Sequence, residues 1–315
     1  MLANAKNSPN GALAFELNVL GRLKFANVAM PLAQSPALGA YLKRSGVTVA
    51  ANDTLRSSAA RGTARIVNCD RRLSADDIAI VLDDAYVPGY KLENPSLTNW
   101  FSESDAWWFD NVRRNVDRLD SPVASAIAAS LAIDAGRYVM SFTDETRQFR
   151  QPLSVVYRRL WSVEPEPYNN GGGNLFHNTS AENFLVDPQV IENFGDLMFL
   201  RMPDAHVKAT RESLGNGAWA EEWLRGGNSF WDELESSQQG RFGSATPTKS
   251  QYLKMLENLL EQASNSKTWA IALMESGFVA TQDIVDCIAK YRRVDCIYTK
   301  DFSELTGTKA VVITA

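Results

Sequence analysis

The segment that decides the fold is residues 25–53, which read FANVAMPLAQSPALGAYLKRSGVTVAAND. Residues 25–30 form an apolar run typical of a short buried strand, and a turn around residues 34–36 separates it from a helix expected over 37–44. Gly46 is placed to end that helix, and residues 47–51 form a second buried strand with Asn52 and Asp53 at its carboxyl end. This strand–helix–strand unit is typical of doubly wound sheets, which bind ligands at the carboxyl ends of their strands.

The pattern becomes helical from residue 74 to about residue 135. Ser74 and Ser102 each precede acidic residues, as expected of helix N-caps followed by an acidic first turn. Trp108, Val112 and Val116 follow at helical spacing, and residues 121–135 form an alanine-rich buried helix. We therefore expect a helical insertion in the sheet domain.

The rest of the chain alternates strands and helices. Residues 164–173 are a loop by composition, and strands are expected over 175–177, 196–200, 269–274, 295–298 and 309–314, with helices over 249–263 and 281–291. We expect an α/β fold with a Rossmann-like sheet flanked by helices. The predicted organisation is a sheet domain from residues 15–72 and 174–315, a helical insertion over 73–160, and a loop-rich segment over 205–248.

Composition excludes several classes of protein. The 315 residues are 45% hydrophobic, which is enough for a sizeable core, and the net charge of −5 has the wrong sign for gripping nucleic acid by phosphate neutralisation alone. The three cysteines include no CxxC pair, and two histidines are too few for a zinc framework with them. No run of about 18 apolar residues and no secretory pattern at residues 1–6 is visible, so we expect a cytoplasmic protein with no membrane partner.

Three segments carry a resemblance to a known family. Residues 30–38 (MPLAQSPAL), Gly46 and the Asn52-Asp53 pair are similar to the pattern D-P-F-x-G-x-G, a helix, and then N-D. Residues 99–103 (NWFSE), 111–114 (NVRR) and the alanine-rich helix are similar to a target-recognition insertion, and residues 178–181 (NTSA) and 196–204 (DLMFLRMPD) to N-x-D-A and D-V-V-Y-L-D-P-P-Y. In this order they resemble the Dam-type (alpha-group) DNA adenine methyltransferases.

The catalytic motif departs from that family. The resemblance implies an aspartate and a prolyl carbonyl that accept hydrogen bonds from the adenine amine, and a tyrosine that stacks on the flipped base. The matching positions are Arg201, Met202, Pro203 and Asp204. Arginine has only donors, and its positive charge opposes the charge that develops on the attacking nitrogen.

The cofactor motif departs as well. Gln34 and Pro36 replace the two glycines that approach S-adenosylmethionine, and proline neither adopts glycine-only conformations nor offers an N–H. Leu32 replaces a phenylalanine, and Ser180 replaces an aspartate that the resemblance places against the cofactor's adenine. Asn52 and Asp53 are retained, either to bind the cofactor's ribose or as a turn signal after a strand.

Together these losses predict a catalytically degenerate methyltransferase homologue that carries no cofactor and acts by binding. It would be a regulatory or specificity partner, in the setting of restriction-modification or phage defence, with another protein as its partner. One alternative is a divergent, active S-adenosylmethionine-dependent DNA adenine methyltransferase in which Asp204 or Asp196 is the acceptor. Another is a structural module for protein interactions that binds no ligand.

Three further groups of residues leave alternatives open. Basic residues in the first half could follow a DNA backbone, although aspartates lie among the later ones: Arg56, Arg61, Arg65, Arg71, Arg72, Arg113, Arg114 and Arg118. Trp100, Trp107, Trp108 and Phe101 are either base-stacking or core residues, with the core favoured for Trp108 and Phe101. Trp219, Trp223, Phe230 and Trp231 are either anchors for a partner or local core.

Overall fold

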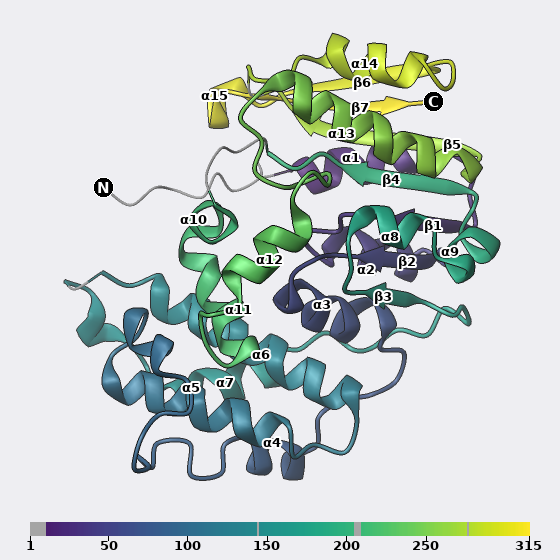
Figure 1. The fold of residues 1–315 in the computed structure, drawn as a ribbon. Coiled ribbons are helices and arrows are strands. Elements are labelled where there is room, and N and C mark those ends of the chain that lie inside the picture. Colours follow the sequence, from purple (N-terminus) through teal and green to yellow (C-terminus); the bar gives the residue numbers. More distant parts are fainter. Residues whose placement is uncertain (1–10, 144, 205–208, 276) are drawn as a thin grey trace.

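The computed structural model describes residues 11–143, 145–204, 209–275 and 277–315. Within them the chain forms a seven-stranded sheet in the order β3-β2-β1-β4-β5-β7-β6 (Figure 1). Strands β1 to β5 are parallel, and β7 runs antiparallel to both of its neighbours. The strands are β1 (Asn27–Met30), β2 (Thr48–Asn52), β3 (Leu175–His177), β4 (Leu197–Arg201), β5 (Thr268–Met274), β6 (Cys296–Asp301) and β7 (Lys309–Thr314).

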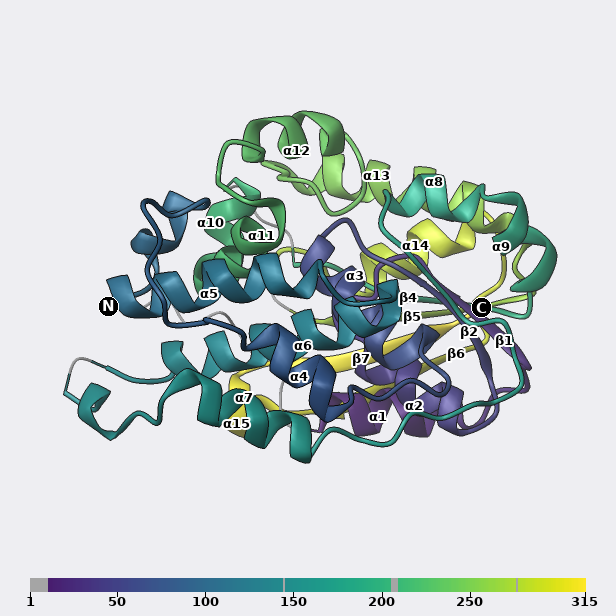
Figure 2. The same ribbon diagram turned by 90° about the horizontal axis from the view of Figure 1, so that it is seen from below.

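Helices cover both faces of the sheet, which confirms the predicted Rossmann-like α/β fold (Figure 2). Because successive strand residues point to opposite faces, Val28 and Met30 contact one helical layer and Ala29 the other. The first layer contains α1 (Ala12–Leu20) and α2 (Ala37–Arg44). The second contains α8 (Ala181–Leu185), α9 (Pro188–Asn193), α13 (Lys249–Gln262) and α14 (Thr281–Ala289). Two short helices complete the described elements of this region: η5 (Ala263–Asn265) follows α13, and α15 (Ser303–Thr306) follows β6.

The predicted helical insertion lies between β2 and β3. Ser74 and Ser102 each accept a hydrogen bond from a first-turn amide, so the two expected caps begin α4 and α5; Ser121 caps α6 in the same way. The elements are α3 (Arg56–Gly62), η1 (Thr63–Val67), α4 (Ala75–Val81), η2 (Pro95–Asn99), α5 (Glu103–Val116), α6 (Pro122–Met140), η3 (Arg147–Phe149) and α7 (Leu153–Ser162).

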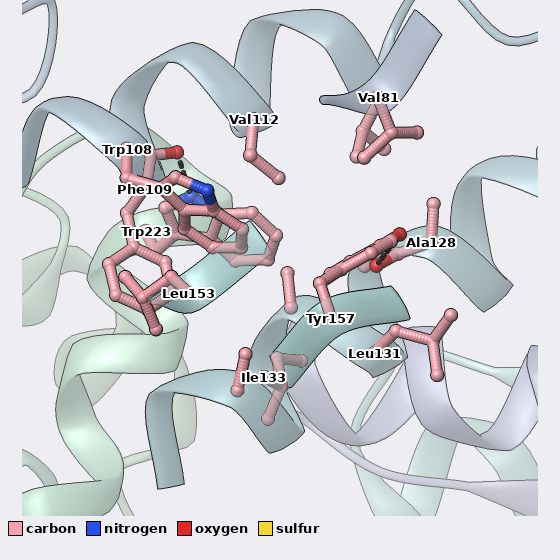
Figure 3. Close-up of a cluster of buried hydrophobic side chains, with 14 of the residues drawn as sticks. Val81, Trp108, Phe109, Val112, Ala128, Leu131, Ile133, Leu153, Tyr157 and Trp223 are labelled. Atoms are coloured by element: carbon pink, nitrogen blue, oxygen red, sulfur yellow. Dashed lines mark hydrogen bonds between the residues drawn. The ribbon is translucent and has the colours of Figure 1, made fainter. Parts of the chain in front are cut away.

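The insertion has an aromatic-rich core of its own (Figure 3). Trp108 is fully buried and Phe101 nearly so, which confirms their predicted core positions, while Trp107 is partly exposed. The hydroxyl of Tyr157 on α7 donates to the carbonyl of Ala128 on α6 at 3.1 Å, so the polar end of this buried ring is satisfied. These contacts join α5, α6 and α7 into one layer.

Helix α6 is the one helix among the described residues that is long and apolar enough to cross a membrane by length and composition. Most of that helix is buried inside the protein, where it contacts α3, α5 and α7. Its alanine-rich sequence is therefore accounted for by burial at the centre of the insertion.

The loop-rich expectation for residues 205–248 needs correction. Residues 205–208 lie outside the described residues, but the remainder contains α10 (Thr210–Leu214), η4 (Gly215–Gly217), α11 (Ala218–Arg225) and α12 (Trp231–Gln238). Gly226 ends α11 in the left-handed conformation, with φ 76°. Glycines that end short helices have the composition of a loop, which explains the error. Trp219 and Trp223 of α11 are buried in the core of the insertion.

Candidate functional site at the carboxyl edge of the sheet

The predicted site residues meet at the carboxyl edge of the sheet, where β1 and β4 are neighbours and the strand order reverses. This is the switch point at which doubly wound sheets bind ligands. Leu32, Gln34 and Pro36 lie in the loop between β1 and α2. The others follow the next strands: Asn52 and Asp53 at β2, Ser180 after β3, and Arg201, Met202, Pro203 and Asp204 at β4.

The loop after β1 keeps a backbone conformation that suits glycine, although its sequence has none there. Gln34 has a φ of 54°, in the left-handed region. Its backbone N–H donates to the Asp53 carboxylate at 2.9 Å, and the Ala33 N–H donates to the Asn52 carbonyl at 2.8 Å. Pro36 lies immediately before α2 with a φ of −73° and supplies no amide to a ligand. The loop is therefore closed onto the end of β2.

Asp53 binds its own loop. Its second carboxylate oxygen accepts from the backbone N–H of Leu55 at 3.0 Å, and the residue is 5% exposed. Burial, with a smaller contribution from Glu221, raises the pKa of Asp53 to about 6, although the two backbone amides oppose the shift. Each carboxylate oxygen therefore accepts a hydrogen bond from the backbone of the loops beside it.

The side chains of Asn52 and Ser180 are also hydrogen-bonded to other parts of the protein. The fully buried amide of Asn52 donates to the carbonyls of Pro31 at 2.9 Å and Thr179 at 3.0 Å, and its oxygen accepts from the Thr179 N–H at 3.0 Å. Ser180 caps α8 by accepting from the Asn183 N–H at 3.2 Å, and Arg241 donates to the same hydroxyl. Asn52 thus joins the loops after β1, β2 and β3, and Ser180 begins a helix.

Arg201 is held by a buried ion pair. Its Nε and Nη2 donate to the two carboxylate oxygens of Glu16 on α1, at 2.9 and 2.6 Å. The side chains are 17% and 9% exposed, and Nη1 also donates to the Ala33 carbonyl at 3.2 Å. Arginine therefore links the end of β4 to α1 and to the loop after β1, at the place where the resemblance requires an acceptor.

Met202, Pro203 and Asp204, the remaining residues that match the catalytic pattern, differ in what they contact. The Met202 N–H donates to the Ala272 carbonyl at 2.8 Å, which extends the β4–β5 ladder by one residue. The Pro203 carbonyl accepts from the Tyr252 hydroxyl at 2.7 Å, and Asp204 is exposed. A hollow of about 20 Å³ beside them has room for about one water molecule.

A later segment crosses the same edge. The Phe242 N–H donates to Glu182 at 2.7 Å, and Phe242 packs against Tyr252. A side-chain carbon at Gly243 would lie 3.9 Å from both Leu32 and Pro203. Residues 241–243 thus lie between α8 on one side and the loops that follow β1 and β4 on the other. This places them over the strand ends where a cofactor would sit.

Two carboxylates that the sequence pattern did not single out organise the neighbourhood. Glu221 and Glu222 on α11 are fully buried. Glu221 accepts from the backbone N–H groups of Arg56 and Ser57, at 2.8 and 3.0 Å, and so satisfies the first amides of α3. Glu222 accepts from Arg211 and from two indole N–H groups, those of Trp100 and Trp231. A run of charge beside large aromatics was the only signal, and it is equally typical of a solvated surface.

A cleft of about 650 Å³ opens next to the closed loop. It lies between the β1–α2 loop, α3, α6 and residues 214–220, and it is lined by Gln34, Pro36, Arg61, Arg137 and Trp219 among others. The described part of the chain therefore leaves open space beside Gln34 and Pro36, between the sheet and the insertion.

The structure bears differently on the aromatic residues at 219–231 and on the arginines of the first half. Trp219, Trp223 and Trp231 are buried, so the partner-anchor interpretation of these three residues is wrong; Phe230 is half-buried and stays open. Arg61, Arg65, Arg71 and Arg72 line one pocket, and each pairs with an acid. Arg113, Arg114 and Arg118 of the α5 region also pair with acids, respectively Asp117, Glu93 and Asp83.

Asp196 does not reach this edge. It precedes β4, at the opposite end of the strand, where it accepts from the Ala26 N–H and from Lys267. These hydrogen bonds, the one from Lys267 first, lower the pKa of Asp196. Its suggested role as an acceptor for adenine is therefore wrong.

Comparison with known proteins adds no assignment. No protein-family model matches the chain, and a search of curated proteins finds no match either.

Proposed function

We propose that this chain is a methyltransferase-like protein that no longer methylates and that acts by binding. The observation that carries the proposal is the ion pair of Arg201 with Glu16, because it places a largely buried cation, bound to a carboxylate, at the strand end where adenine methylation needs an acceptor. Adenine N6 becomes positive as it attacks the methyl group of a sulfonium, so a cation there raises the barrier.

The topology supports the methyltransferase part of this proposal. A sheet in the order 3-2-1-4-5-7-6 in which only β7 is reversed is the arrangement expected of a methyltransferase sheet. The insertion after β2 also lies where the resemblance expects a target-recognition region.

The loss of cofactor binding rests on three engaged groups. Asp53 binds two backbone amides, Ser180 caps α8 and binds Arg241, and residues 241–243 cross the strand ends. A cofactor would have to displace these contacts before forming its own. We therefore propose that S-adenosylmethionine is not a resident ligand.

We infer a binding role because the sheet fold is present while the side chains at the motif positions are bonded to the protein itself. A cytoplasmic regulatory or specificity partner of an active enzyme, in restriction-modification or phage defence, is the role that we propose. The open cleft beside Gln34 and Pro36 is the surface from which a search for the partner protein or DNA should begin.

The test is calorimetric titration of the whole chain with S-adenosylmethionine, together with an assay for transfer of a labelled methyl group to adenine-containing DNA. An active Dam-type enzyme measured in parallel is the positive control. We expect neither binding at millimolar cofactor nor transfer of label. Micromolar binding with transfer would refute the proposal.

The rival function is a divergent adenine methyltransferase with Asp204 as the acceptor. Exposure of Asp204 at the end of β4 favours this rival, because a carboxylate there is accessible to a ligand. It predicts transfer of label that Asp204→Ala abolishes and that Asp232→Ala, a change elsewhere on the chain, leaves intact. Transfer that survives Asp204→Ala would remove this rival.

A further inference from the structure

A second cavity, of about 430 Å³, lies along the flank of α2. Its walls are α2, residues 61–73 and residues 161–168, which lead out of α7 toward β3. The volume is in the range of sites that hold small molecules. This cavity adjoins the cleft described above, because Pro36 and Arg61 line both, but Gln34, Asn52, Asp53 and Ser180 are not among its lining residues.

The lining carries a marked excess of positive charge. Six basic side chains and two acidic ones, Glu164 and Glu166, line the cavity. Three acids outside the lining offset part of this excess, since Asp134 pairs with Arg61, and Asp77 and Asp120 pair with Arg71. The basic residues are Lys43, Arg44, Arg61, Arg65, Arg71 and Arg72. Burial is the main cause that lowers the pKa of Arg61; repulsion from Arg137, outside the lining, and from Arg65, inside it, lowers it further, while Asp134 opposes the shift. An anion in the cavity would relieve this repulsion.

The polar groups of the cavity are incompletely paired with one another. Arg65 and Glu164 approach only to 3.4 Å, and among the described residues the buried Glu164 Oε2 and Arg71 Nε find no hydrogen-bond partner. Buried polar atoms normally have partners, so such atoms at a cavity mark a place for a ligand or for ordered water. An oxyanion would satisfy Arg71 and compete with Glu164 for Arg65.

The cavity also has an aromatic and apolar wall. The Trp161 indole N–H donates to the Leu73 carbonyl at 2.9 Å, which fixes the ring, while Tyr41 and Tyr168 are 54% and 42% exposed. Ala40 on α2 and Ile127 on α6 complete this wall. A planar heterocycle can stack on such rings while arginines bind an attached phosphate.

We propose that this cavity, the arginine pocket, binds a free mononucleotide, with its phosphate on the arginines and its base against the aromatic wall. The combination decides the class of ligand: arginines alone would take inorganic phosphate, and the aromatic wall alone would take a nucleoside. The proposal does not depend on whether the chain binds S-adenosylmethionine.

The test is calorimetric titration of the whole chain with AMP, GMP, CMP, adenosine, inorganic phosphate and a short 5′-phosphorylated oligonucleotide. We expect at least one nucleoside monophosphate to bind at least tenfold more tightly than both adenosine and phosphate. Arg65→Gln removes a loosely paired cation and Ala40→Trp fills the cavity from a half-buried position on α2. Each variant should weaken nucleotide binding at least tenfold.

Arg118→Gln, which removes an exposed arginine paired with Asp83 outside the pocket, is the matched control and should leave binding unchanged. Thermal melts of all three variants identify any that fail to fold. If Arg65→Gln fails to fold, Ala40→Trp still tests the proposal. Equal affinity for AMP and phosphate, equal affinity for AMP and adenosine, or no binding at millimolar ligand would overturn the proposal. Tenfold tighter binding of the oligonucleotide, or unchanged affinity in both pocket variants, would overturn it as well.

Discussion

The ion pair between Glu16 and Arg201 is the contact most open to a quantitative test. Two charges about 4 Å apart attract by roughly 4 kcal/mol at an effective dielectric constant of about 20, and desolvation offsets part of this. The pair is bidentate, at 2.9 and 2.6 Å, and mostly buried. We therefore expect a net coupling of about 2 kcal/mol between the two side chains.

A double-mutant cycle measures that coupling. Glu16→Gln leaves the guanidinium without its carboxylate, and Arg201→Met leaves the carboxylate without its cation, so each should cost about 2 to 3 kcal/mol of unfolding free energy. The double variant should cost less than the sum of the two by the coupling energy. Urea unfolding followed by tryptophan fluorescence gives the free energy of each variant.

The matched control is the pair of Arg118 with Asp83, which has a similar distance of 2.8 Å but side chains that are 49% and 51% exposed. Exposed pairs contribute about 0.5 kcal/mol, and added salt screens them. A Glu16–Arg201 coupling no larger than that of the control would refute the argument that Arg201 is committed to the fold.

Three further changes test the neighbourhood of the site. Asp53→Asn removes a carboxyl whose pKa is raised from 3.8 to about 6; because the folded state holds that proton more tightly, wild-type stability relative to the variant should fall by about 2 kcal/mol as the pH rises from 4 to 7, measured by urea unfolding at each pH. Glu222→Gln turns an amide N–H toward buried donors and should cost about 2 to 3 kcal/mol by the same assay. Gly136→Ala would place a carbon 2.0 Å from the Trp219 ring and should cost about 2 kcal/mol, despite the better helix propensity of alanine.

For each of these three predictions, one outcome would contradict it. A stability difference between wild type and Asp53→Asn that stays constant with pH would mean that this carboxyl titrates normally. An effect of Glu222→Gln no greater than that of Glu233→Gln, at an exposed position on α12, would mean that the buried network is not structural. Gly227→Ala, where the added carbon meets nothing within 4 Å, is the control for Gly136→Ala, and equal effects would exclude the clash.

Local sequence signals were sufficient for much of the sheet domain. The helix over 37–44 and the strand over 309–314 have the expected bounds, and Ser74 and Ser102 begin helices as predicted. Periodicity, capping residues and glycine stops act over a few positions, so they are visible along the chain. The same signals failed for residues 209–238, because short helices that are separated by glycines have the composition of a loop.

The candidate site was located but not understood from sequence. The losses at Gln34, Pro36 and Arg201 are visible in the chain, because particular residue types are required at those positions. What occupies these groups was not visible, since Glu16 lies 185 positions before Arg201 and Arg241 lies 61 positions after Ser180. Side-chain contacts at such separations leave no local pattern.

By itself, the sequence determined the α/β class, the helical insertion and which residues stand at the positions that match the Dam-type cofactor and catalytic patterns. Only the tertiary structure decided that Asp53 faces its own loop, that Glu221 and Glu222 are buried, and that four arginines of residues 61–72 gather around one cavity. The physical reason is that side-chain burial and charge pairing depend on which elements pack together. That packing is set by the whole core and not by neighbours along the chain.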